Sequence, residues 1–283
     1  MKRILVVSGS RADYGLLEWP VKVLKEDGAF EVDLLEMWGK QFEPSFSAVR
    51  RRIEEKRPDL MLILGDRFEI LAAATAAHLQ RVPIAHIGGG DVTEGSYDDA
   101  MRDCISRMAT VHFVTSTSAM ARLSHLGLRN VHLVGNPGID YIRRFVWKSE
   151  RPIADPYVVV SYQAETIDGV VDTDSVIQAI GNRYAVWILP NPDRGNDAIR
   201  DVAIGCSLTG RVMAAESYAH DKFLNLLAHC DEFIGNSSSM LYEAPELGIK
   251  TRMIGKRQRG RTIPWGDGKA SERMANILKR CAL

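Results

Sequence analysis

The sequence has few cysteines and no excess of either charge, and each absence removes a class of protein. Its four cysteines lie far apart, with no CxxC pair and no Cys/His cluster: Cys104, Cys206, Cys230 and Cys281. We interpret them as buried free thiols of a cytoplasmic, reducing compartment, and we expect no metal site. The 36 basic and 36 acidic residues balance to a net charge of zero, so the overall charge does not favour nucleic acid or an anionic membrane as a partner.

The sequence also lacks long apolar runs and the common nucleotide-binding fingerprints. Its longest apolar runs, such as residues 70–77, are far shorter than the roughly 20 residues that span a bilayer. The two basic residues at the start precede only a short apolar run, which is typical of a first strand rather than of a signal peptide. There is no complete GxGxxG and no GxxxxGK[ST] segment, so NAD and ATP are not favoured and no cofactor is expected.

What the sequence does have is an alternation of short apolar runs with helical patterns. Strands are predicted at 3–7, 31–36, 60–64, 82–87, 111–115 and 131–134, and again at 157–161, 185–189, 210–214, 232–234 and 251–254. Helices are predicted at 46–56, 67–80, 98–108 and 271–283. Continuous apolar strands that end in Gly or Asp are typical of a parallel sheet covered on both faces.

A charged stretch with two prolines, residues 143–156, interrupts this alternation. We interpret it as the connection between two domains, 1–145 and 146–283. The predicted fold class is therefore α/β, with two doubly wound, Rossmann-like domains facing a cleft. The final helix is expected to pack back across the domains.

The loops after the first and third predicted strands carry candidate site residues, because such loops bind ligands in doubly wound folds. Arg11 lies in SGSRADYG, where small residues let the backbone approach an anion and the guanidinium can hold a phosphate. A capped turn with a surface arginine is the alternative. Asp66 follows the third strand and suits a general acid or base, or a sugar-hydroxyl acceptor. It equally suits a helix N-cap.

The richest loop follows the fourth predicted strand and reads HIGGGDVTEG over residues 86–95. Its three glycines indicate tight backbone geometry or close approach to a ligand that Asp91 would contact. His86 is the histidine best placed for proton transfer, although a satisfied structural histidine is the alternative. Asp98 and Arg102 follow at i, i+4 on one helix face. They form either a surface ion pair or an acid held by a cation in the cleft.

The second half carries a serine-rich segment, GNSSS, after a predicted strand and at the expected start of a helix. Asn236, Ser237 and Ser238 supply polar groups there, and free amides at a helix start favour an anion. Glu243, further along, suits a ribose diol. A serine N-cap would explain one serine but not three.

The segment RQRGR, which contains Arg257, Gln258 and Arg261, adds cationic and amide side chains after the next strand. A basic surface loop is the alternative. The spacing of residues in RQRGR alone does not decide between a binding loop and a surface loop.

Taken together and in order, the segments GSRADYG, LGDRFE, HIGGGDVTEGSYDDAMR, HFVTS, VGNPGID, PNPD, IGNSSSMLYEAPELG and RQRGR resemble the hydrolysing UDP-N-acetylglucosamine 2-epimerases. The branch that serves sialic-acid and related nonulosonate synthesis is the most similar. The resemblance runs from residue 2 to about residue 261 and implies a GT-B-like fold with a UDP-sugar in the cleft. The implied reaction removes the C2 proton, eliminates UDP and adds water to give N-acetylmannosamine, without metal or nicotinamide. A homodimer or higher homo-oligomer is expected.

The resemblance also implies roles for single residues. Arg11 corresponds to an arginine near the diphosphate, and Asp66 and Asp98 correspond to acidic catalytic positions, with Arg102 one turn after the second. Ser237 corresponds to a phosphate-contacting serine and Glu243 to a ribose-binding glutamate. The loop with Arg257 and Arg261 corresponds to the family's RQxGR segment.

Three departures from the family pattern separate the possible functions. Gly88 stands where relatives have Glu or His, Gln163 stands where they have a phosphate-side His, and a segment after residue 40 is missing. Gln163 can hydrogen-bond phosphate but cannot carry charge or a proton. These losses favour a non-catalytic or regulatory UDP-sugar-binding protein, whereas Asp66, Asp98 and Arg102 favour an enzyme. A GT-B glycosyltransferase is a weaker alternative.

Overall fold

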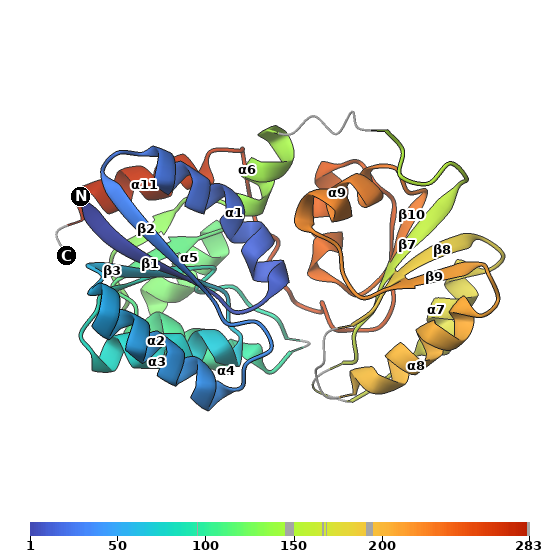
Figure 1. Ribbon diagram of the computed structural model, residues 1–283, viewed down its shortest axis with the longest axis horizontal. Helices are drawn as coiled ribbons and strands as arrows, with labels where there is room; N and C mark the ends of the chain where they lie inside the picture. Colours follow the sequence, from blue (N-terminus) through green and yellow to red (C-terminus); the bar gives the residue numbers. More distant parts are fainter. Residues whose placement is uncertain (95, 145–149, 166, 168, 191–194, 282–283) are drawn as a thin grey trace. The chain divides into compact units, whose positions relative to one another are not determined.

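The computed structural model describes residues 1–283 except 95, 145–149, 166, 168, 191–194 and 282–283, and the side chains of 11 and 12. The chain forms two compact units (Figure 1). The first contains residues 1–92, 98–144 and 262–283, and the second contains residues 93–97 and 145–261. We expected 146–283 as one domain; the structure groups the segment from residue 262 onward with the first unit.

The first unit is a parallel sheet with helices on both faces. Its elements are β1 (Lys2–Ser8), α1 (Arg11–Glu26), β2 (Phe30–Glu36), α2 (Phe42–Lys56), β3 (Leu60–Leu64), α3 (Phe68–Leu79), β4 (Ile84–Ile87), α4 (Asp98–Met108), β5 (Val111–Val114), α5 (Thr117–His125), β6 (Val131–Leu133), α6 (Pro137–Arg144) and α11 (Ala270–Arg280). The strand order is β2-β1-β3-β4-β5-β6. The order reverses between β1 and β3, and ligands of doubly wound sheets bind beyond the carboxyl ends of the strands at such a point.

Two apolar layers explain why the strands of this unit read as unbroken apolar runs. In β1, Ile4 and Val6 pack toward α1 and α11, whereas Leu5 and Val7 pack toward α2 and α3. Successive side chains of a strand point to opposite faces, so both sets of positions must be apolar. Figure 1 shows α1 and α11 on one side of this sheet and α2 and α3 on the other.

A buried carboxylate joins α11 to this unit. Asp140 in α6 is fully buried and accepts hydrogen bonds from the backbone nitrogens of Ala270 (3.0 Å) and Ser271 (2.6 Å) and from the Ser271 hydroxyl (2.7 Å). These backbone N–H groups begin α11 and have no acceptor within their own helix. Asp140 therefore caps α11 from another element.

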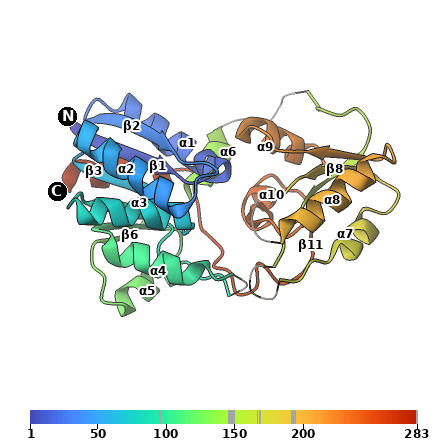
Figure 2. The same cartoon turned by 60° about the horizontal axis from the view of Figure 1, so that its bottom comes forward.

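The second unit repeats the same architecture. Its elements are β7 (Tyr157–Ser161), α7 (Thr173–Ile180), β8 (Tyr184–Ile188), α8 (Asn196–Ser207), β9 (Val212–Ala215), α9 (His220–Ala228), β10 (Glu232–Gly235), the 3-10 turn η1 (Ser238–Met240), α10 (Glu243–Glu246) and β11 (Thr251–Met253). The strand order β11-β10-β7-β8-β9 reverses between β7 and β10. Val176 of α7 and Ile199 of α8 pack on one face of this sheet, and Leu227 of α9 and Ala244 of α10 pack on the other. Figure 2 labels these four helices.

The predicted α/β class with two doubly wound sheets is confirmed, and each predicted strand has an observed counterpart within a few residues. Two expectations were wrong. The GNSSS segment does not begin a regular helix, because η1 has three residues and α10 only four, and α10 contains Pro245 and ends before Gly248 at φ +73°. The cysteines form no disulfide among the described residues, but only Cys230 is buried, and Cys104 is exposed on α4.

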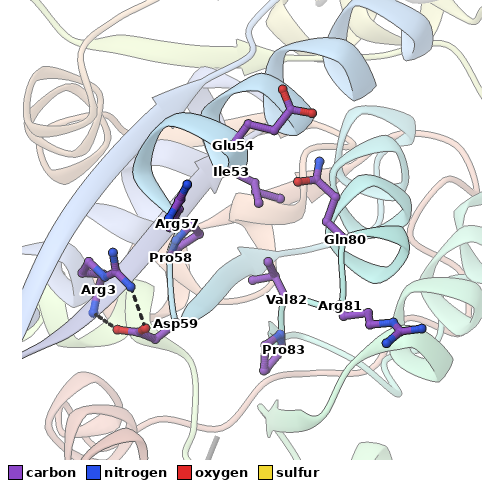
Figure 3. Close-up of a pocket in the computed structure, with 10 residues that line it drawn as sticks. All are labelled: Arg3, Ile53, Glu54, Arg57, Pro58, Asp59, Gln80, Arg81, Val82 and Pro83. Carbon is purple, nitrogen blue, oxygen red and sulfur yellow. Dashed lines mark hydrogen bonds and ion pairs between the residues drawn. The ribbon is translucent and has the colours of Figure 1, made fainter.

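A cavity of about 540 Å³ lies at the amino ends of β1, β3 and β4 (Figure 3). Arg3, Arg57 and Arg81 contribute to its lining, and Arg3 pairs with Asp59 at 3.1 Å. Ligands of doubly wound folds bind at the opposite, carboxyl ends of the strands, so this cavity is separate from the candidate site. Within the described residues, no helix is both long and apolar enough to cross a membrane.

Candidate active site

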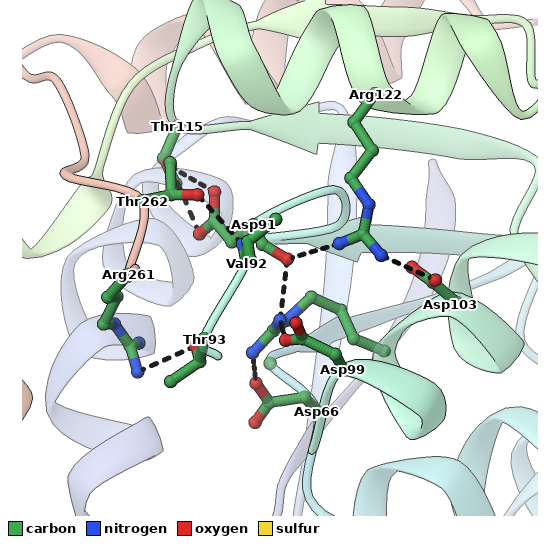
Figure 4. A network of polar contacts seen from close by, with 12 residues as sticks. Asp66, Asp91, Val92, Thr93, Asp99, Asp103, Thr115, Arg122, Arg261 and Thr262 are labelled. Atoms are coloured by element: carbon green, nitrogen blue, oxygen red, sulfur yellow. Dashed lines mark hydrogen bonds and ion pairs between the residues drawn. The ribbon is translucent and has the colours of Figure 1, made fainter. Parts of the chain in front are cut away.

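A buried arginine organises the carboxyl edge of the first sheet. Arg102 is 2% exposed and its guanidinium donates to the Asp91 carbonyl oxygen at 2.7 Å and to the carboxylates of Asp66 and Asp99. Burial alone would lower the pKa of Arg102, but the two carboxylates outweigh burial and raise it above its usual value. A buried cation with these partners is stable in the charged form. Figure 4 shows Asp66, Asp91 and Asp99 gathered at this position.

The loop beside Arg102 is fixed by its own contacts. The Asp91 carboxylate accepts a hydrogen bond from the Thr115 hydroxyl at 3.0 Å, and the Asp91 carbonyl also accepts from Arg122 at 3.0 Å. Gly90 has φ +80°, and a Cβ there would lie 2.5 Å from the Ala119 carbonyl oxygen. Only glycine fits this approach. Asp91, which we expected to contact the substrate, thus has its carboxylate engaged with Thr115.

Gly88, in the same loop, is different because it has space around it. Its φ is +83°, and the nearest atom to an added Cβ would be the Asp91 Oδ2 at 3.9 Å. The chain therefore has room but no side chain at the position where the resemblance expects a carboxylate or imidazole.

His86 is fully buried and both of its ring nitrogens have partners. Nε2 lies 2.8 Å from the Gly65 carbonyl oxygen, and Nδ1 lies 3.1 Å from the Ser106 hydroxyl. A carbonyl only accepts, so Nε2 carries the proton and Nδ1 accepts from Ser106. Burial lowers the pKa of His86 to about 4. This geometry gives His86 a positioning contact next to Asp66 rather than a nitrogen open to substrate.

Asp13, in the first turn of α1, is an acidic residue that the sequence pattern did not single out. Its Oδ2 is buried with no hydrogen-bond partner among the described residues. Burial raises the pKa of Asp13 to about 7, although Ser10 and Arg67 act to lower it. Its position at the start of the helix that follows β1, two residues after Arg11, is the signal that could have identified it. Arg11 itself begins α1, and its side chain lies outside the described part of the structure.

In the second unit, paired amides join the ends of the two strands at the sheet's reversal. The Gln163 backbone nitrogen donates to the Asn236 Oδ1 at 2.8 Å, and the Asn236 Nδ2 donates to the Gln163 carbonyl at 2.8 Å. Gln258 donates through Nε2 to the Asn236 carbonyl at 2.7 Å. Three predicted binding residues are thus brought together beyond β7 and β10.

The remaining predicted residues of this unit flank that group. Arg257 donates to the Ala164 carbonyl at 2.9 Å, which holds its loop against the segment after β7. The Ser237 hydroxyl accepts from the Ser239 nitrogen at 3.3 Å, and Ser238 begins η1. Arg261 makes a long contact of 3.4 Å to the Thr93 hydroxyl.

Glu243 is the first residue of α10 and is 3% exposed. Its Oε1 lies 3.1 Å from Nε2 of His220 at the start of α9. A nearly buried carboxylate held by one ring nitrogen keeps acceptor capacity for further donors.

The described residues include no group of three or more His, Cys, Asp or Glu that could hold a metal ion. A family model described as UDP-N-acetylglucosamine 2-epimerase matches residues 36–263, a range that includes the residues above except those of the SGSRADYG segment. The chain belongs to the UDP-N-acetylglucosamine 2-epimerase family.

Curated relatives of this epimerase family member are distant but match along most of its length. It is 25% identical to the UDP-N,N'-diacetylbacillosamine 2-epimerase (hydrolyzing) of Legionella pneumophila, over 100% of this chain and 97% of the relative. It is 26% identical to the UDP-N-acetylglucosamine 2-epimerase of Neisseria meningitidis serogroup B, over 92% and 81%, and to the polysialic acid biosynthesis protein P7 of Escherichia coli, over 92% and 80%. The Legionella alignment runs over 366 residues against 283 here, so this epimerase family member is shortened.

Solved structures confirm the fold. A Methanocaldococcus jannaschii UDP-GlcNAc 2-epimerase in complex with UDP-GlcNAc and UDP has a TM-score of 0.80 at 15% identity, covering 99% of this chain and 100% of that one. The S. aureus MnaA–UDP co-structure has a TM-score of 0.79 at 16% identity, covering 99% and 96%.

In this family member, Asp99 is a partner of Arg102 that the sequence pattern did not single out. We expected Asp98 at i, i+4, and the structure shows an ion pair between Arg102 and Asp99 at i, i+3 within α4. Both spacings lie on one helix face, so the sequence pattern alone does not separate them. Asp98 is the first residue of α4 and is half-buried.

Proposed function

We propose that this chain is a hydrolysing 2-epimerase that acts on UDP-N-acetylglucosamine or a related UDP-amino sugar and releases UDP. The observation that carries the proposal is the buried Arg102 holding Asp66 and Asp99 at the carboxyl edge of the first sheet. Burying the Arg102 guanidinium costs free energy unless its hydrogen-bond partners are all in place. Binding a nucleotide does not require such an arrangement in the first unit, whereas proton transfer by a fixed carboxylate does.

The proposed chemistry uses carboxylates as proton carriers. A base removes the proton from C2, and the electrons of that C–H bond form a C1–C2 double bond. UDP leaves with the electrons of the C1–O bond. Water then adds its hydroxyl to C1 while C2 receives a proton on the opposite face, which gives the N-acetylmannosamine configuration. Asp66 and Asp98 are the proposed acid and base, and Arg102 fixes Asp66 through its hydrogen bond.

The nucleotide is proposed to bind the second unit. Gln163, Ser237 and the loop of Arg257 surround the point where the strand order reverses, which is where a diphosphate would bind. Glu243 would accept hydrogen bonds from the ribose hydroxyls. The family's nucleotide specificity supports UDP as the ligand.

A second candidate function is a UDP-sugar-binding protein without turnover. The observation that favours it is Gly88. The family that the sequence resembles has Glu or His at this position, whereas here there is open space and no side chain. Gln163 points the same way, since an amide cannot transfer a proton at neutral pH. Asp66 and Arg102 favour the enzyme over this candidate.

One assay separates the two. Incubation with UDP-N-acetylglucosamine, and in parallel with UDP-N,N'-diacetylbacillosamine, is expected to release UDP together with the 2-epimeric free sugar. Asp66→Asn and Asp98→Asn should each lower the rate by roughly 10²- to 10⁴-fold while leaving UDP affinity nearly unchanged. Asp103→Asn, on the same helix but paired with Arg122 at 2.8 Å, is the matched control and should retain the rate.

If UDP binds tightly and neither nucleotide sugar yields free UDP, the binding protein is the correct function. If Asp98→Asn turns over like the wild type, the proton is carried elsewhere. A cytoplasmic location, a homo-oligomeric state and a role in sialic-acid synthesis stay predictions.

A further inference from the structure

A relay of three amide groups fixes the direction of the Gln163 side chain. Asn196 is the first residue of α8 and is 2% exposed. Its Oδ1 lies 2.8 Å from the Ala164 backbone nitrogen, and its Nδ2 lies 3.0 Å from the Gln163 Oε1. All three residues belong to the second unit.

The direction of each hydrogen bond in this relay follows from its first member. A backbone N–H only donates, so the Asn196 atom that faces Ala164 must be the carbonyl oxygen. The other Asn196 atom is then the NH₂ group, which donates to Gln163, and the Gln163 atom that meets it must be the oxygen. The Gln163 nitrogen is consequently turned away from Asn196, and among the described residues none accepts a hydrogen bond from it. The half-buried side chain thus presents two N–H donors.

We propose that Asn196 is a positioning residue that turns the Gln163 carboxamide so that its NH₂ group donates to the diphosphate of the bound nucleotide. The inference rests on the proposed function, because it deepens the nucleotide site of the second unit. Asn236 fixes the Gln163 backbone from the other side, so the backbone is held by one asparagine and the side chain by another.

The relay explains how a neutral residue can replace an imidazole at this position. An unconstrained glutamine samples both orientations of its carboxamide before an anion binds, and only the orientation with the nitrogen toward the anion is favourable. Because the Gln163 oxygen already accepts a hydrogen bond from Asn196, the Gln163 NH₂ group remains a donor at every pH at which the protein is folded. Its contact with phosphate is therefore insensitive to pH, which a histidine contact is not.

The test is a double-mutant cycle that measures UDP affinity by calorimetry. In Asn196→Asp the new carboxylate only accepts, so Ala164 still donates to one oxygen and Gln163 must turn its NH₂ group toward the other. The Gln163 oxygen then faces the phosphates, and UDP affinity is expected to fall roughly 10- to 100-fold. Gln163→Met removes the amide and should lower UDP affinity by a similar factor.

The coupling between the two changes carries the conclusion. The added charge of Asn196→Asp lowers affinity equally in both backgrounds, so any excess loss seen only when Gln163 is present reports the reversed amide. Uridine, which has no phosphate, should bind all four proteins alike. Additive losses, or an equal loss of uridine binding, would overturn the inference.

A measurement on the wild type covers the case in which Asn196→Asp does not fold. The side-chain NH₂ resonances of Gln163, assigned by their absence in Gln163→Met, should shift when UDP is added and not when uridine is added. Unchanged resonances at saturating UDP would overturn the inference alone. A wild type that binds no UDP overturns the proposed function as well, so the two failures are distinguishable.

Discussion

Arg102 shows how much of the first unit's site depends on one side chain. Its guanidinium reaches a backbone carbonyl and two carboxylates that come from different strand-end loops and from α4. Removing one acceptor leaves a buried N–H without a partner, which costs more than the hydrogen bond itself contributes. The same residue is thus expected to affect both stability and turnover.

Asp99→Ala is expected to lower the free energy of unfolding by about 1–3 kcal/mol, because buried Arg102 loses an acceptor. Asp103→Ala, which removes a partly exposed partner of Arg122 on the same helix, should cost about 0–1 kcal/mol. Urea denaturation of the two variants measures the difference. Equal costs would show that Asp99 is not a structural partner of Arg102.

Glu243→Gln keeps the shape of the side chain and removes its charge. If Glu243 accepts hydrogen bonds from the ribose, UDP binding should weaken by about 1–3 kcal/mol. Glu246→Gln, in the same short helix, should leave the affinity unchanged. Calorimetry measures the UDP affinity of both variants. An unaltered affinity in Glu243→Gln would show that Glu243 does not bind the ribose.

At the scale of elements, the fold was predictable because burial on both faces of a sheet leaves a direct mark on the sequence. The strand β3, LMLIL, is fully buried and was predicted with its observed bounds. The helix expected after GNSSS was not observed, because Pro245 and Gly248 limit α10 to a single turn. Periodicity does not reveal such short turns.

The site was predictable only in part, for a different physical reason. Asp66 and Gln163 could be named as candidates because each follows a strand near the point where the strand order of its own sheet reverses. Asn196 and Asp13 were missed, since their significance lies in hydrogen bonds between loops remote in sequence and in burial.

The cap of α11 gives an element-scale prediction. Asp140→Ala leaves the first two N–H groups of α11 buried without an acceptor, and a loss of roughly 2–4 kcal/mol in unfolding free energy is expected. Asp267→Ala removes a partly exposed partner of Arg273 near the same helix and should cost about 0–1 kcal/mol. Thermal or urea unfolding that is equally affected by both would contradict the cap.

At the scale of the whole molecule, stability should depend on pH through three buried groups of the first unit. Burial lowers the pKa of both His86 and His112 to about 4. In the unfolded chain they take up protons below about 6.5, so stability is present above that pH and is lost as pH falls toward 4. Each histidine changes the unfolding equilibrium by up to about tenfold per pH unit in this window.

Asp13 acts in the opposite direction. Because its folded pKa is raised to about 7, its contribution is present at low pH and is lost as pH rises from about 3.8 to 7. Two histidines against one carboxyl leave a net loss of stability on acidification. Asp13→Asn should therefore raise the urea midpoint at pH 8 and lose that advantage near pH 4. A constant difference from pH 4 to 8 would show that Asp13 ionises normally.

The return of residues 262–283 to the first unit has a consequence for the order in which the protein can be made. Met274, Ala275 and Leu278 of α11 pack with Ile4 and Leu17 in one core, yet the ribosome makes them after the entire second unit. During synthesis one face of the first unit's sheet is therefore covered by α1 but not yet by α11 while the second unit emerges. The second unit, whose sheet is contiguous in the chain, can be finished first, which reverses the usual N-to-C order of domain folding.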